Sequence, residues 1–312
     1  MSYLTDMNDK ITISTFQLFA IFPDNESARK YLEGRLWPNG ARCPVCHGGE
    51  CVTPRKAGFY RCNTCSEDFT IRTGTVMERS HVPLHKWLYA MYLLVTARKG
   101  ISSMQLSKEI GVTQKTAWFL LHRLREACGG DLTKLQGIVQ VDETFVGGKE
   151  ANKHERKKLK MGRGAVGKSI VVGLREKGGR TKAEVIPSTD ATSLQGAVHK
   201  HVVPGSTIHT DEHAGYVDLE GLFYKHARVN HGAGEFVRDG VSTNSIESVW
   251  AVFKRGLMGV YHHVEPKHLA RYVDEFTFRL NDGDVKRHTL KRLDSFVDAV
   301  VGKRLTYAEL IA

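Results

Sequence analysis

The chain has no run of about 18 or more apolar residues, the length that a membrane-spanning helix needs. Its longest apolar stretch, residues 87–96, is too short to span a membrane and is typical of a buried helix. The N-terminus lacks a basic segment followed by an apolar one, so we expect no secretory signal peptide. These absences argue against a membrane protein and favour a cytoplasmic location, where disulfide bonds are rare.

Acidic residues are scarce relative to basic ones. The chain carries 34 Asp+Glu against 45 Lys+Arg, which gives a formal net charge of +11. The rest of the composition, 41% hydrophobic and 25% charged over 312 residues, is that of a globular protein and argues against disorder. Because such a chain can bury a core without excess charge, the charge indicates a polyanionic partner: DNA, RNA or an anionic membrane surface.

Four of the six cysteines form two CxxC pairs with fifteen residues between them: Cys43 with Cys46, and Cys62 with Cys65. This spacing is typical of a zinc ribbon, in which four thiolates hold one zinc ion tetrahedrally. Disulfides or inert buried thiols are the weaker alternative. The site is expected to be structural, because four thiolates leave no open position for water. Cys51 and Cys128 are interpreted as ordinary thiols, and His47 as a weak substitute ligand.

Residues 83–130 have a helical pattern, with two short helices separated by Gly111 and with Thr113 as the N-cap of the second. The pattern predicts a helix-turn-helix whose second helix, about 114–127, presents four side chains to DNA: Gln114, Lys115, Trp118 and, further along, Arg123. Polar residues at the start of a recognition helix can reach base edges in the major groove. The alternative is a plain helical hairpin; the net charge favours DNA binding.

From Gly137 onward, short β-prone segments alternate with helical ones. We predict strands at 138–141, 169–174, 183–186 and 207–210, a fifth near 224–229, and helices at 192–201, 245–257 and 268–280. Strands and helices that alternate within about 150 residues predict an α/β core with helices layered on the sheet.

Two aspartates end predicted strands. Asp142 follows the first strand of this region and Asp211 follows the fourth. If these strands are neighbours, the two carboxylates stand side by side and repel each other, and a divalent cation relieves that repulsion. Mg²⁺ binds to one or two carboxylates plus waters and phosphate oxygens. Two such ions about 4 Å apart can clamp both reacting oxygens of a phosphodiester.

A third acid is expected from a helix. Glu247 lies on one helix side with Lys254, seven residues later, which is placed to hold a DNA phosphate. Asn244 is a rival for the third position, since an amide oxygen can also coordinate a hard cation. Glu143 and Glu212 compete with the two aspartates, but strand residues alternate between faces, so Glu143 is expected to point away.

Residues 149–168 are strongly basic, with eight Lys/Arg against two Glu. They lie between the first two strands and include Lys157 and Lys158. We interpret them as a basic loop that holds backbone phosphate, which adds affinity without sequence information. A solvated loop is the alternative.

Several stretches together resemble bacterial insertion-sequence transposases of the ISXO2-like type, from about Phe16 to Asn281. They are residues 42–46, 69–75, 100–102, 112–118, 141–149 (VDETFVGGK), 209–212, 244–250, 261–262 and 267–272. The resemblance implies an RNase H-like catalytic domain with a DDE-type triad, preceded by a zinc ribbon and a helix-turn-helix. Carried onto this sequence, the triad is Asp142, Asp211 and Glu247, with Lys254 downstream.

The resemblance also implies the reaction: metal-assisted strand cleavage at element ends, then attack of the freed 3′-hydroxyl on target DNA. The implied cofactors are Mg²⁺ or Mn²⁺ in the catalytic site and structural Zn²⁺. The implied partner is double-stranded DNA, bound by a homodimer or larger synaptic complex associated with the nucleoid.

The expected division of the chain has five parts. They are a helical lead-in (1–40), the ribbon (41–80), the helix-turn-helix region (81–132), the catalytic domain (136–285) and a helical tail (286–312). Two other functions stay open: a DNA-binding regulator with an inactive α/β domain, and a nuclease of the same fold without strand transfer.

Overall fold

The computed structural model describes residues 12–148, 154, 156, 158, 167–230, 237–238 and 240–312. The chain forms two compact units. One contains the residues up to Gly130 together with Asp282–Ala312, and the other is Asp131–Asn281. The chain therefore leaves the first unit, builds the second and returns to complete the first. Nothing in the described part of the chain is a helix long and apolar enough to cross a membrane.

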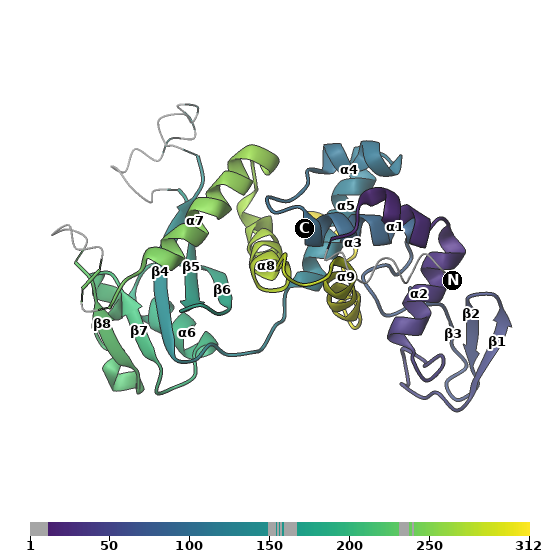
Figure 1. Cartoon of the computed structure of the whole chain (residues 1–312), viewed down its shortest axis with the longest axis horizontal. Helices are drawn as coiled ribbons and strands as arrows, with labels where there is room; N and C mark the ends of the chain where they lie inside the picture. Colours follow the sequence, from purple (N-terminus) through teal and green to yellow (C-terminus); the bar gives the residue numbers. More distant parts are fainter. Residues whose placement is uncertain are drawn as a thin grey trace. The chain divides into compact units, whose positions relative to one another are not determined.

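The first unit combines helices with a small antiparallel sheet (Figure 1). Its elements are α1 (Thr15–Ile21), α2 (Asn25–Leu36), β1 (Val52–Lys56), β2 (Phe59–Cys62), β3 (Asp68–Phe69), α3 (Leu84–Thr96), α4 (Ser103–Ile110), α5 (Gln114–Cys128), α9 (Thr289–Asp298) and α10 (Tyr307–Ile311). Gly111 takes the left-handed conformation between α4 and α5 (φ 62°), which a residue without a Cβ adopts at no steric cost. Thr113 caps α5 by accepting from the Thr116 amide.

The returning segment supplies core to the first unit. Leu293 and Phe296 of α9 are fully buried, and α9 packs on α2 and α3. The buried Arg292 guanidinium donates to the Val95 carbonyl of α3 at 2.9 Å. The sequence pattern shows this segment as a helical tail. Its packing is tertiary and is visible only in the folded chain.

The second unit has a five-stranded mixed sheet in the order β6-β5-β4-β7-β8. The strands are β4 (Ile138–Val146), β5 (Ser169–Glu176), β6 (Thr181–Ile186), β7 (Thr207–Thr210) and β8 (Lys225–Arg228); the helices are α6 (Ala191–His201), α7 (Asn244–Gly256) and α8 (Pro266–Asp282). β4, β5 and β6 pair antiparallel, whereas β7 is parallel to both β4 and β8. These elements confirm the predicted strands, helices and layered α/β core.

Helices cover both faces of this sheet (Figure 1). Val141 and Val172 pack with Leu194 of α6 in one buried cluster. On the other face, Val171 packs with α7 and α8. Alternate residues of each strand thus serve two separate cores, which explains why the central strands are apolar along most of their length.

The first strand is longer than the sequence pattern predicted. β4 continues past Asp142 to Val146 because its antiparallel pairing with β5 runs on to Val146 opposite Ser169. Asp142 therefore lies within the strand, directly opposite Gly173. The neighbouring strand β7 is the one that ends near the level of Asp142, at Thr210.

Candidate active site and metal centre

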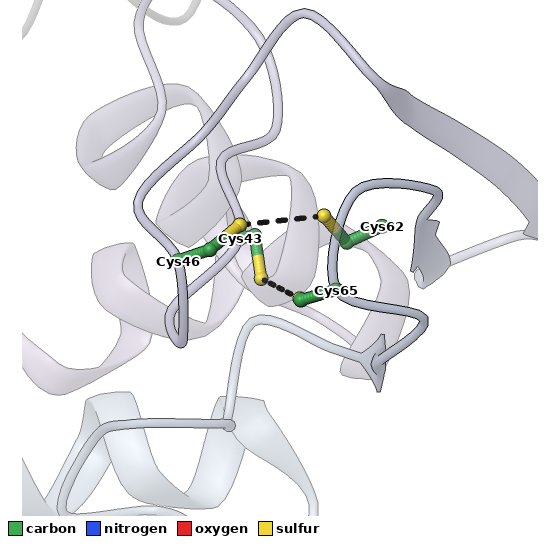
Figure 2. A group of neighbouring side chains, drawn as sticks. All are labelled: Cys43, Cys46, Cys62 and Cys65. Carbon is green, nitrogen blue, oxygen red and sulfur yellow. Dashed lines mark hydrogen bonds between the residues drawn. The ribbon is translucent and has the colours of Figure 1, made fainter.

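The four paired cysteines meet in one cluster. Cys43 and Cys46 lie on one knuckle, Cys62 ends β2, and Cys65 follows in the second knuckle (Figure 2). The Cys43 and Cys65 sulfurs are 3.5 Å apart, as are those of Cys46 and Cys62, and all four lie within 4.8 Å of one another. Around a tetrahedral ion with Zn–S bonds of about 2.3 Å, sulfurs stand about 3.8 Å apart. The arrangement fits one zinc ion.

The thiols of the cluster do not shift alike: the pKa of Cys46 and of Cys65 is raised, whereas that of Cys62 is lowered. The pKa of Cys62 is lowered to about 6, first because the backbone N–H of Cys65 donates to its sulfur. The Val45 amide donates to the Cys43 sulfur at 3.4 Å. Backbone N–H groups that point at sulfur stabilise the charged form that metals bind.

Asp142 and Asp211 come together on adjacent parallel strands. The parallel register pairs Ile138 with Thr207 and Gln140 with His209, and continued by two residues it brings Asp142 level with Asp211. Asp142 lies on the α7 face, because its cross-strand partner Gly173 lies directly under that helix. β4 and β7 are therefore neighbours, which is the condition that the sequence set for bringing the two aspartates together.

Asp142 is partly buried and lies near other acids. Its pKa is raised to about 7, first by burial and then by the negative charges of Glu143, Asp211 and Glu247. Burial and like charges both disfavour the ionised form of a carboxyl group. A divalent cation beside this carboxyl group would favour its ionised form. The positive charge would offset both the burial and the repulsion from the other acids.

Glu247 and Asn244 both lie in the first turn of α7, and both side chains are exposed. Glu247 accepts a hydrogen bond from the Thr243 hydroxyl at 2.9 Å, and its charge acts on Asp142. Lys254 lies in the last turn of the same helix and is exposed.

The three acids are neighbours without forming a closed ligand set. Within the described ranges, only the four cysteines bring three or more potential metal ligands within 4.8 Å of one another. The carboxylates of Asp142, Asp211 and Glu247 therefore stand farther apart than the cysteine sulfurs do. Mg²⁺ binds only one or two carboxylates and keeps waters and phosphate oxygens, so it needs no closed set of protein ligands.

A second group of polar residues adjoins Asp211 and was not assigned a role from the sequence. The Tyr216 hydroxyl donates to Glu143 Oε2 at 2.7 Å, and His213 Nε2 lies 3.8 Å from Glu143 Oε1. The His213 amide donates to Asp211 Oδ1 at 3.0 Å. Glu143 belongs to the α6 face of the sheet, since its partner Val172 lies in that core, as strand alternation predicts. The only signal in the sequence is adjacency to the two aspartates.

The predicted DNA-contacting residues of α5 divide into exposed and buried ones. Gln114 and Lys115 are exposed; Gln114 donates to Ser103 Oγ at 2.9 Å, and the Lys115 ammonium lies 4.6 Å from the Tyr307 ring centroid. Trp118 is half-buried against the His122 ring.

The environment of Arg123 does not agree with its prediction as a DNA-contacting residue. Its side chain is buried, donates to the Glu78 carbonyl and lies over the rings of Trp87 and Phe119. Burial lowers the pKa of Arg123 to about 10. A side chain in this position supports the helix core. In the basic segment, Lys157 lies outside the described residues, and Lys158 is half-buried.

The structure combines a unit that holds a four-cysteine ribbon with a mixed α/β unit whose sheet carries a group of acids. This combination defines the class of protein. Residues 134–281 match the family profile of the ISXO2-like transposase domain, and residues 23–68 match that of the transposase zinc-ribbon domain. A curated relative, "Uncharacterized protein in transposable element ISH50" from Halobacterium salinarum, is 30% identical over 275 residues, which is 83% of this chain and 91% of the relative.

The chain therefore belongs to the ISXO2-like transposase family, as its sequence motifs indicated. Among solved structures, the chain is similar to the "Mos1 transposase paired-end complex with left transposon end". That match has 11% identity, covers 62% of this chain and 76% of the other, and has a TM-score of 0.21.

Proposed function

We propose that the protein is a DNA transposase that cleaves DNA at insertion-sequence ends and joins the freed 3′-hydroxyl to target DNA. The observation that carries this proposal is the placement of Asp142. It is a partly buried carboxyl group of raised pKa, level with Asp211 and acted on by the charge of Glu247. Membership of a transposase family supplies the reaction class.

Asp142, Asp211 and Glu247 would hold the catalytic metal, Mg²⁺ or Mn²⁺. When bound, the ions activate the attacking oxygen and stabilise the leaving one. Glu247 is proposed as the third ligand because its carboxylate charge acts on Asp142, and Asn244 is the rival that would offer a neutral amide oxygen. The Thr243 hydroxyl would orient Glu247, and Lys254 would hold a DNA phosphate.

We infer that the α/β unit is RNase H-like. In support, β6, β5 and β4 form an antiparallel set, β7 and β8 extend it in parallel, and helices cover both faces. The acids lie where β4 and β7 meet.

The first unit would bind the element ends. The cysteine quartet would hold structural Zn²⁺, and α4 with α5 would act as a helix-turn-helix that reads double-stranded DNA through Gln114 and Lys115. The basic segment with Lys157 and Lys158 would contact backbone phosphate. Joining two ends calls for a homodimer or larger complex, and DNA binding implies a nucleoid-associated protein.

Strand transfer on element-end DNA with Mg²⁺ tests the proposal. Asp142→Ala should abolish cleavage and transfer while end binding is retained, and Glu212→Ala, which removes an exposed neighbouring acid, should leave both intact. Wild-type transfer by Asp142→Ala would overturn it. Metal-dependent nicking without joining would indicate a nuclease, and DNA binding with neither activity would indicate a regulator.

A further inference from the structure

The helix that carries Glu247 has an unusual start. Thr243 is the N-cap residue of α7, but its side chain caps no backbone amide, and its backbone (φ −111°, ψ 3°) is not extended. The Thr243 hydroxyl donates to the Glu247 carboxylate instead. A helix N-terminus leaves several backbone N–H groups without intrahelical partners, and an N-cap side chain ordinarily satisfies those of the second or third residue.

The missing cap comes from the strand that carries Asp142. The Gln140 side-chain oxygen accepts from the amides of Ser245 at 3.1 Å and Ile246 at 3.2 Å, which are the second and third residues of α7. It also accepts from the Ser245 hydroxyl. Gln140 is 4% exposed, and its amide nitrogen lies 3.4 Å from the Ser242 hydroxyl. Gln140 thus fixes the first turn of α7 to β4, two residues before Asp142.

A second contact fixes the same helix one turn later. Gly173 lies directly opposite Asp142, and a Cβ there would stand 2.5 Å from Trp250 Cζ2 of α7. The absence of a side chain at Gly173 lets the Trp250 ring lie against the sheet beside Asp142. Gln140 and Gly173 therefore set the position of the helix at two points that flank Glu247 in sequence.

We propose that Gln140 is a positioning residue of the catalytic site: by capping α7 it fixes Glu247 in register with Asp142, and it frees Thr243 to orient the Glu247 carboxylate. The inference rests on the proposed function, in which these acids hold the metal. Gln140 would act through Glu247 and would not itself hold the metal, because its side-chain oxygen accepts from the amides of Ser245 and Ile246. Its effect should appear on the chemical step and on metal binding, because a misplacement of about 1 Å can cost roughly 100-fold in rate.

The experiment compares full-length variants. Gln140→Leu keeps the size and removes the acceptor, while Gln140→Glu keeps an oxygen that the same amides can use. Asp190→Ala is the matched control, because Asp190 caps α6 in the same unit by accepting from the Ser193 amide at 2.8 Å. Each variant is measured for kcat and KM of end cleavage, for Mn²⁺ binding by calorimetry and for urea unfolding.

We expect Gln140→Leu to lower kcat by about 10–100-fold and to weaken Mn²⁺ binding, with KM for end DNA nearly unchanged. Gln140→Glu should restore most of the kcat and most of the Mn²⁺ affinity. Asp190→Ala should lose stability with normal kcat and Mn²⁺ binding. If Gln140→Leu does not fold, Gln140→Asn, which withdraws the oxygen by one methylene, carries the same comparison against Asp190→Ala.

Wild-type kcat and Mn²⁺ binding in Gln140→Leu would overturn the inference, and so would equal losses in Gln140→Leu and Asp190→Ala. Asp142→Ala separates this inference from the proposed function. If Asp142→Ala cleaves normally, the proposed function fails. If Asp142→Ala is inactive and Gln140→Leu is not impaired, only the positioning role fails.

Discussion

At the scale of single residues, Asp142 is placed where function and stability oppose each other. Partial burial and the negative charges of three nearby acids disfavour the ionised form of its carboxyl group in the folded chain. A raised pKa in the folded state means that the folded chain binds more protons between the two pKa values. Folding is therefore favoured below the ordinary pKa of 3.8, and stability is lost as the pH rises through about 7.

We predict that Asp142→Asn makes the metal-free protein more stable at pH 8 while it abolishes cleavage. An increase in pKa from 3.8 to about 7 corresponds to at most about 4 kcal/mol. Urea unfolding at pH 4 and pH 8 in magnesium-free buffer measures the difference, which should nearly vanish at pH 4. Glu212→Gln makes the same charge change at an exposed site and should have little effect. Equal stability of Asp142→Asn and wild type at pH 8 would contradict the argument.

A second prediction concerns the cysteines. Cys62→Ser should reduce bound zinc well below one ion per chain and unfold the ribbon, because a structural zinc site contributes directly to folding. Zinc content by elemental analysis and protease sensitivity of residues 41–80 measure the two effects. Cys51→Ser is the control, since Cys51 lies outside the cluster and is exposed. Retention of one zinc ion by Cys62→Ser would remove that residue from the ligand set.

At the scale of elements, the sequence predicted what local pattern determines. Periodicity predicts the strands of the α/β unit, and residue spacing predicts the cysteine cluster. The turn between α4 and α5 at Gly111 follows from a conformation that only some residues adopt. Gln140 capping a helix that begins more than one hundred residues later has no local signal. Arg123 was misassigned because a helical pattern does not show which polar position another element will cover.

The contact of α7 with the sheet gives the prediction at this scale. Gly173→Ala should destabilise the second unit by about 1–3 kcal/mol, because the new methyl overlaps the Trp250 ring. Trp250→Phe replaces the ring by a smaller one and so makes space for the new methyl group. The double variant should therefore be more stable than the sum of the two single-variant losses predicts. Gly196→Ala in α6 is the matched control, since a Cβ there meets nothing within 4 Å. Strict additivity in the urea-unfolding cycle would show that the two sites are not in contact.

At the scale of the whole molecule, the net charge of +11 sets the ionic behaviour of DNA binding. End binding should weaken steeply with salt, with a slope of about −0.9 per phosphate contact in a log–log plot. Lys115→Ala and the pair Lys157→Ala with Lys158→Ala should each make that slope shallower by about 1 per contact removed. Lys30→Ala, an exposed lysine on α2, serves as a charge-matched control. A slope unchanged in all variants would exclude these lysines from the interface.

The return of the chain to its first unit gives a further prediction. Phe296→Ala should lower the unfolding free energy of the first unit by about 3–5 kcal/mol, because a fully buried ring leaves a cavity. The second unit should be unaffected, so only one of two unfolding transitions should shift in calorimetry. Val301→Ala, at a half-exposed position of the same segment, should change little. Movement of both transitions together would show that the units unfold as one.

That return also reverses the order in which a ribosome could finish the two units. The second unit is complete once residue 281 has emerged, whereas the first, although begun earlier, lacks α9 until the last part of the chain is made. At roughly 5–20 residues per second, the surface of α3 that receives α9 stays uncovered for on the order of 10–40 s. Only at the end of that interval, after residue 281 has emerged, would the nascent chain carry a finished α/β unit together with an unfinished ribbon and helix unit. The nascent chain is therefore most exposed to chaperones and proteases at its oldest end.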